Sequence, residues 1–148
     1  MVIRGGAGGV RAEVPAGLAS SLAVRFDHLI FAEKVAVVDD TGDTRALSVF
    51  GGRAAQVVAD ATGIPAARIA ELSILDHVAH DGLTVIRTED VTLPNFEIWM
   101  PTLRWDSAVA AVIAAGAADV QPAGPAGRAA TVDAPPPQPG APGRREDQ

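Results

Sequence analysis

Cysteine is absent from this chain, which excludes disulfide bonds, thiolate nucleophiles and cysteine metal sites. Tyrosine is also absent, and Lys34 is the only lysine. The longest uncharged apolar run, residues 107–118, is too short to cross a bilayer. A secretory signal is not visible, because Arg4 and Arg11 are followed by glycines and Glu13 rather than by a continuous apolar stretch. We therefore expect a soluble, cytoplasmic protein with no membrane partner.

Signatures of catalysis are equally scarce. The serines lie outside any GxSxG motif, and the GxGxxG and GK[ST] patterns that bind phosphates are missing. Asp39, Asp40 and Asp43 crowd a predicted turn, where turn chemistry accounts for them, and their spacing does not fit a calcium loop. We predict a non-enzymatic protein with no catalytic residue and no cofactor.

Two histidines, His77 and His80, lie three residues apart near the end of a predicted helix, beside Asp81. Imidazoles that share a helix face can bind a metal when a third ligand arrives from elsewhere. Histidines at a helix C-terminus more often interact with the helix dipole and the last carbonyls. We therefore predict no metal site.

The formal net charge is −6 at neutral pH, and its location is informative. Within residues 121–148 the arginines and the acids cancel, so all the net negative charge lies in residues 1–120. A body of that sign repels phosphate backbones at long range. The charge therefore disfavours nucleic acid as a partner.

Composition divides the chain into three parts. Residues 1–17 are rich in glycine and predict a flexible lead-in, whereas residues 121–148 are rich in proline, alanine and glycine and predict a disordered tail. Residues 18–120 carry the apolar content that a single domain needs.

Patterning within residues 18–120 predicts short strands mixed with helices, so the expected fold class is α+β. Residues 18–32 fit either a strand or a helix. The expected elements are a hairpin of residues 34–38 and 45–50 around a turn at 39–43, paired helices at 53–62 and 65–79, strands at 83–88 and 96–100, and a last helix at 107–118.

The paired helices carry small and apolar residues where helix-turn-helix proteins place their packing residues: Val58, Ala59, Gly63, Ile64, Ile69 and Leu72. Residues 82–100 then read as two strands joined by a loop. Residues 45–100 thus resemble the helix-turn-helix superfamily in its winged-helix form, with residues 82–100 as the wing. The resemblance implies that the second helix would enter a DNA major groove, with Arg68 on that helix and Arg87 on the wing.

Charge in this region opposes DNA binding. Between Gly51 and Glu89 the bases are Arg53, Arg68 and Arg87, against five acids. Proteins that neutralise several phosphates need the reverse balance. A helix-turn-helix DNA-binding regulator is therefore the alternative to a winged-helix-like domain that contacts proteins.

Gly51, Gly52 and Arg53 lie between a predicted strand and the first helix of the pair. Helix N-termini offer free N–H groups to an anion, and a guanidinium would add to the attraction. A tight turn explains the two glycines equally well. A small anion-binding or catalytic domain is the third hypothesis.

Residues 96–105, FEIWMPTLRW, concentrate aromatic side chains in a chain that has few. If Phe96, Ile98 and Met100 face the core, Trp99 faces the other way, so the strand is apolar on both sides. Trp and Arg are frequent anchors in interfaces. We therefore predict self-association or a protein partner as the function, through an interface of Phe96, Ile98, Trp99, Met100, Arg104 and Trp105, aided by the last helix.

Overall fold

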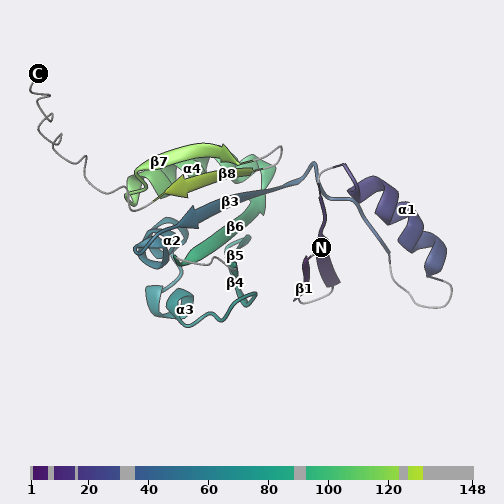
Figure 1. The fold of residues 1–148 in the computed structure, drawn as a ribbon, viewed down its shortest axis with the longest axis horizontal. Helices are drawn as coiled ribbons and strands as arrows, with labels where there is room; N and C mark the ends of the chain where they lie inside the picture. Colours follow the sequence, from purple (N-terminus) through teal and green to yellow (C-terminus); the bar gives the residue numbers. More distant parts are fainter. Residues whose placement is uncertain are drawn as a thin grey trace, which may run out of the picture.

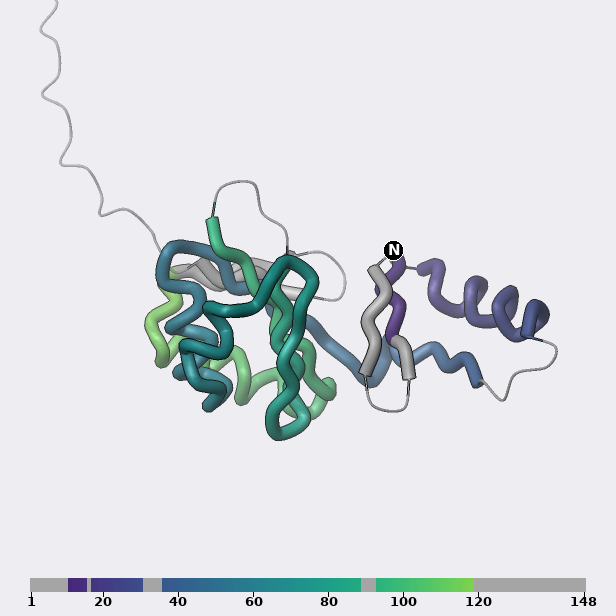
Figure 2. Tube along the Cα trace, turned by 90° about the horizontal axis from the view of Figure 1, so that it is seen from below, coloured from purple at the N-terminus to yellow at the C-terminus, as the bar shows by residue number. Residues whose placement is uncertain are grey.

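The computed structural model describes residues 2–6, 9–15, 17–30, 36–88, 93–123 and 127–131. Its N-terminal part holds an antiparallel hairpin, β1 (Val2–Gly6) and β2 (Gly9–Glu13), followed by helix α1 (Ala19–Leu29). Figures 1 and 2 show α1 set to one side of the main sheet, away from the helices that pack on it.

The rest of the described chain forms a six-stranded sheet in the order β4-β5-β6-β3-β8-β7 (Figure 1). Its pairs are antiparallel except for β3 and β8, which run parallel. The strands are β3 (Thr44–Phe50), β4 (His77–His80), β5 (Leu83–Thr88), β6 (Asn95–Pro101), β7 (Asp119–Ala123) and β8 (Gly127–Thr131).

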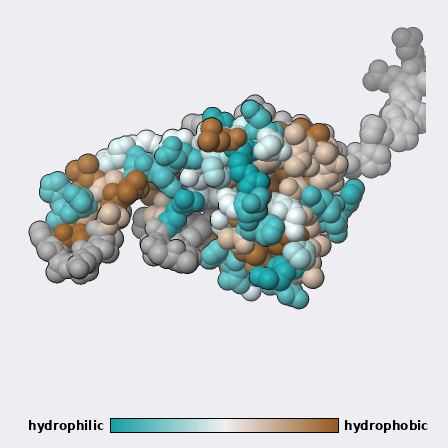
Figure 3. All heavy atoms as spheres, turned by 180° about the vertical axis from the view of Figure 1, so that it is seen from behind, coloured by the Kyte–Doolittle hydropathy of each residue, from teal (hydrophilic) through white to brown (hydrophobic). Residues whose placement is uncertain are grey.

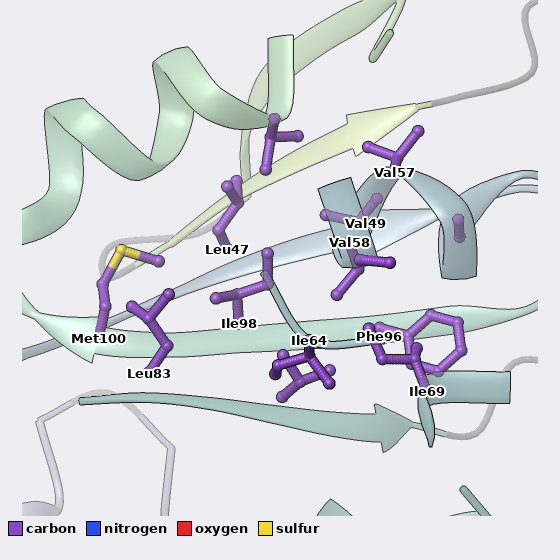
Figure 4. Close-up of a cluster of buried hydrophobic side chains, with 14 of the residues drawn as sticks. Leu47, Val49, Val57, Val58, Ile64, Ile69, Leu83, Phe96, Ile98 and Met100 are labelled. Carbon is purple, nitrogen blue, oxygen red and sulfur yellow. The ribbon is translucent and has the colours of Figure 1, made fainter. Parts of the chain in front are cut away.

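The core lies between this sheet and the helices on one of its faces. Side chains alternate along β6, so Phe96, Ile98 and Met100 point to the helices and are almost fully buried. Leu47 and Val49 of β3 and Leu83 of β5 face the same way (Figure 4). Val85 of β5 is also buried and lies opposite Ile98 in the ladder. Burying each side chain of this size stabilises the fold by about 1.5–3 kcal/mol.

Helix α2 (Ala54–Thr62) lies across β3 and β6 and contacts both α3 (Ala66–Ala70) and α4 (Trp105–Ala114). It buries Ala54, Val57 and Val58, whose spacing of three and four residues makes one apolar stripe. Gly63 ends the helix in a left-handed conformation (φ 74°) and donates its N–H to the Ala59 carbonyl at 2.9 Å. Because glycine adopts that conformation without strain, the chain can reverse toward α3.

Helix α4 (Trp105–Ala114) follows β6 through a short 3-10 turn, η1 (Thr102–Arg104). It buries Trp105 and Val112 against the core, while Ile113 remains exposed. The domain itself therefore covers one side of the helix, which accounts for part of its apolar character.

The structure confirms the α+β class and the antiparallel pairing of the strands predicted at 83–88 and 96–100. The predicted hairpin around residues 39–43 is wrong. Residues 36–38 form no strand, Lys34 and Val35 lie outside the described residues, and β3 pairs with β6 and β8 instead. Sequence-distant partners satisfy the backbone of β3, and local alternation could not indicate them.

The second helix of the pair is shorter than predicted, because it ends at Ala70 rather than near residue 79. Residues 77–80 form β4 and pair with β5 across a two-residue turn, Asp81 and Gly82, with φ angles of 47° and 74°. Two positive φ values define the type I′ turn that suits hairpins, and Asp-Gly is a strong signal for it. The hairpin therefore replaces the last turns of the predicted helix.

Residues 18–32, which fit either structure by sequence, contain α1, while Phe31 and Ala32 lie outside the described residues. The N-terminal hairpin lies where the sequence predicts a flexible lead-in. The last two strands, β7 and β8, occupy the first part of the segment predicted to be a disordered tail, and residues 132–148 lie outside the described residues.

Candidate functional site

The six residues predicted to form an interface do not lie on one surface. Phe96, Ile98 and Met100 are each about 1% exposed and belong to the core. Their inward direction agrees with the alternation read from the sequence, and an interface that involves them stays a prediction. Trp99 lies between them in sequence and faces away from the helices, where it is half-buried.

Trp99 already has neighbours within the chain. Its indole Nε1 donates to Glu97 Oε2 at 2.8 Å, and the guanidinium of Arg11 lies 5.7 Å from the centre of its ring. Ala46 and Thr84 are its partners on the two adjacent strands. The side of the sheet opposite the helices therefore meets the N-terminal hairpin at Trp99, which leaves this indole less available than an isolated surface tryptophan.

Arg104 and Trp105 follow β6 in sequence and have structural partners. The guanidinium of Arg104 donates to the Asp81 carbonyl and forms an ion pair with the Asp81 carboxylate at 3.2 Å. Trp105 is 8% exposed, with the Arg45 guanidinium 5.1 Å from its ring centre. Arg104 thus connects η1 to the β4–β5 turn, and Trp105 connects α4 to β3. Trp105 is therefore part of the core.

The two arginines predicted for DNA binding differ in their surroundings. Arg68 is exposed on α3, a helix of five residues. Arg87 is half-buried, and its Nη1 donates to the Leu72 carbonyl at 2.7 Å. Arg87 thereby stabilises the loop that joins α3 to β4, and only Arg68 presents its charge freely among this pair. DNA binding stays a prediction.

Gly51, Gly52 and Arg53 connect β3 to α2 in a tight turn. Gly51 is buried with φ 129°, its N–H donates to the Pro94 carbonyl at 3.0 Å, and its own carbonyl accepts from Ala54 N–H. Only glycine adopts that backbone conformation at low cost. Arg53 reaches toward Gly116, close to where a Cβ there would lie. The geometry accounts for the two glycines as a turn, and anion binding stays a prediction.

His77 and His80 do not share a face, contrary to the geometry that a metal site there would need. Both lie on β4, where residues three apart point to opposite sides. Among the described residues, no group of three or more histidine or acidic side chains is placed to hold a metal ion.

Residues 39–43, which the sequence indicated only as a turn, form a junction between several elements. The Asp39 carboxylate accepts from the hydroxyls of Thr41 and Ser20, and the Asp40 carboxylate pairs with Arg11 at 2.8 Å. Thr102 donates its N–H and its hydroxyl to the carbonyls of Asp43 and Gly42.

Hydrogen bonds from Thr41 and then from Ser20 hold the pKa of Asp39 below its usual value. The junction joins the N-terminal hairpin, α1 and η1.

Helix α1 and the residue before it expose several large apolar side chains: Leu18, Val24, Phe26 and Leu29. It has no buried residue, and Leu29 is 69% and Val24 58% exposed. Leu18, Phe26 and Leu29 recur at spacings that place them on one side of the helix, and all three are exposed. Figure 3 shows apolar atoms on this projecting end of the molecule. The helical spacing of these residues was visible in the sequence, but their exposure was not.

Comparisons with known proteins return no match to a protein family, to a curated protein or to a solved structure. The winged-helix resemblance therefore stays a prediction. No helix in the described part of the chain has the length and apolarity to cross a membrane.

Proposed function

We propose that this chain is a non-enzymatic protein-interaction domain that acts by self-association or by binding a protein partner. The observation that carries the proposal is the exposed apolar side of α1, formed by Leu18, Phe26 and Leu29. Large contiguous apolar patches on soluble proteins commonly mark interaction sites, because leaving them in water costs free energy that binding recovers.

The arrangement of α1 supports a binding role. A helix of 11 residues is marginal in water by itself, so tertiary or intermolecular packing must supply most of its stability. Within the described residues it is held at its start by the hydrogen bond from Ser20 Oγ to Asp39 Oδ2 at 2.7 Å. A protein that covers Leu29 and Phe26 would supply the missing packing.

A site-specific photo-crosslinker in the full chain tests this proposal. Placed at Leu29, it should give a discrete adduct in cells, because this position lies on the apolar side. Placed at Asp27, two residues away and on the opposite side of the helix, it serves as the matched control and should give none. No adduct at position 29, or equal adducts at both positions, would reject α1 as the contact surface.

The alternative, a helix-turn-helix DNA-binding regulator, rests on Arg68 and on the left-handed turn at Gly63 between α2 and α3. Its test is the fluorescence anisotropy of a labelled DNA duplex, titrated with the protein as salt is raised. Binding that weakens with salt and disappears in Arg68→Ala would favour the regulator. Absence of binding at low salt would remove it.

A further inference from the structure

One edge of the six-stranded sheet is formed by β4, which pairs with β5 on one side. Its four residues are exposed or half-buried, and within the described residues no strand pairs with its outer side. Ile74 and Leu75, just before it, are each 53% exposed. Edge strands with unpaired backbone groups are templates on which another strand can add.

The hairpin geometry decides which backbone groups of β4 point outward. A type I′ turn at Asp81 and Gly82 makes His80 and Leu83 the hydrogen-bonded pair that flanks it. Such pairs alternate along an antiparallel ladder, so Val78 also bonds toward β5, whereas His77 and Ala79 do not. The hydrogen bond from Arg87 N–H to the Asp76 carbonyl at 3.0 Å continues this alternation. The N–H and C=O groups of His77 and Ala79 therefore face the open edge.

We propose that β4 is the self-association surface of this protein, where it pairs antiparallel with β4 of a second copy about a two-fold axis at Val78. This rests on the proposed function and names the partner as the same chain. An antiparallel pair related by an axis perpendicular to the sheet keeps both helix layers on the same side. One sheet then runs through both copies.

This register matches the chemistry of the strand. His77 lies opposite Ala79 of the second copy, and each of the two symmetry-related pairs exchanges two hydrogen bonds through the outward groups. Asp76 lies opposite His80 of the second copy, so each of the two symmetry-related pairs places a carboxylate across from an imidazole. Among the described residues, the Asp76 carboxylate accepts the N–H of Ser73 at 3.2 Å, and it retains lone pairs for the imidazole.

The neighbouring register is less suitable. An axis at Ala79 would place His77 opposite Asp81 of the second copy, but Asp81 has φ 47° and belongs to the turn. A residue in the left-handed region does not continue a ladder, so only one pair of residues would bond. The axis at Val78 also brings the two Val78 side chains, which pack at the margin of each core, against one another.

The contact is small, because only residues 76–80 of each copy meet, so association should be weak and dependent on concentration. Sedimentation equilibrium of the full chain measures it. Ala79→Pro removes an outward N–H in each copy without touching the β4–β5 bonds, and proline is tolerated on an edge strand in that orientation. We expect the dimer to weaken about tenfold or more, whereas Ala79→Ser, which keeps the N–H, should leave it unchanged.

Charge exchange gives a second test that does not depend on proline. His80→Asp places two carboxylates opposite one another and should weaken the dimer, and adding Asp76→His in the same chain should restore it with the charges reversed. Circular dichroism and urea unfolding of each variant establish that the domain is folded.

A wild-type chain that stays monomeric up to about 1 mM would overturn the proposal, as would a dimer unaffected by both Ala79→Pro and His80→Asp. These results are distinguishable from failure of the proposed function. The crosslink at Leu29 tests α1 alone. If an adduct forms there while the β4 substitutions leave the association unchanged, the protein-interaction function is retained and β4 is rejected as the self-association surface.

Discussion

The guanidinium of Arg11 lies 5.7 Å from the centre of the Trp99 ring, and its Nη2 lies 2.8 Å from Asp40 Oδ2. One side chain of the N-terminal hairpin thus contacts both the sheet face opposite the helices and the junction at residues 39–43. The contact explains why Trp99 is half-buried although the helices lie on the other side of the sheet.

Arg11→Ala should change the environment of Trp99 with little effect on stability. Cation–π contacts and ion pairs at exposed sites each contribute less than about 1 kcal/mol. The two indole N–H signals in a nitrogen-15 NMR spectrum give the readout, and the Trp99 signal should move while the Trp105 signal does not. Arg45→Ala is the matched control and should move the Trp105 signal instead. A shift of the Trp105 signal in Arg11→Ala would contradict the assigned contact.

Stability at acid pH should depend on Asp39. Hydrogen bonds from Thr41 and Ser20 lower its pKa in the folded state below the usual 3.8. A lowered folded-state pKa contributes stability above the unfolded value, and this is lost as the pH falls through the folded-state pKa. Urea midpoints of the wild type should therefore exceed those of Asp39→Asn at neutral pH, and the gap should close well below pH 3.8. A gap independent of pH would contradict this account.

Gly63→Ala should destabilise the domain by about 1 kcal/mol, because alanine is strained at φ 74°. A Cβ there would meet only His80 Nε2 at 3.9 Å, so backbone strain rather than a clash causes the loss. Gly42→Ala is the control, since no atom lies within 4 Å of its Cβ. Urea unfolding of both variants measures the difference. Equal stability for the two would argue against the left-handed helix end.

Phe96→Ala should lower the free energy of unfolding by about 3–5 kcal/mol, because it empties a buried aromatic position in the centre of the sheet. Leu103→Ala, at a side chain that is 98% exposed, should change it by less than about 0.5 kcal/mol. Thermal or urea unfolding separates the two. A small loss for Phe96→Ala would mean that the core is packed differently from the arrangement in Figure 4.

Much of the core could be predicted from sequence, because alternation and helical spacing record burial locally. Phe96, Ile98 and Met100 alternate with polar or half-buried residues, and Val57 and Val58 follow helical spacing. The end of the helix at Gly63 could also be predicted from the sequence. These features depend on neighbours a few residues away, which a sequence pattern contains.

Partners distant in the chain could not be predicted in the same way. Nothing in residues 44–50 indicates that β3 pairs with β6 and β8, and the composition of residues 121–131 argued for a tail. Residues 77–80 have helical spacing but pair with β5 as a strand. The sequence pattern therefore placed the end of α3 too late. The role of Arg11 at Trp99 likewise arises from a tertiary contact across most of the folded chain.

Strand β8 runs parallel to β3 and supplies its second neighbour, with Ala46 opposite Gly127. During synthesis, β3 leaves the ribosome long before the residues that complete its ladder. Its open side must wait for α4 and β7 to emerge first. Pairings between such distant segments slow folding. The nascent chain therefore passes through a period in which the middle of the future sheet is a bare edge, exposed to chaperones and to neighbouring chains alike.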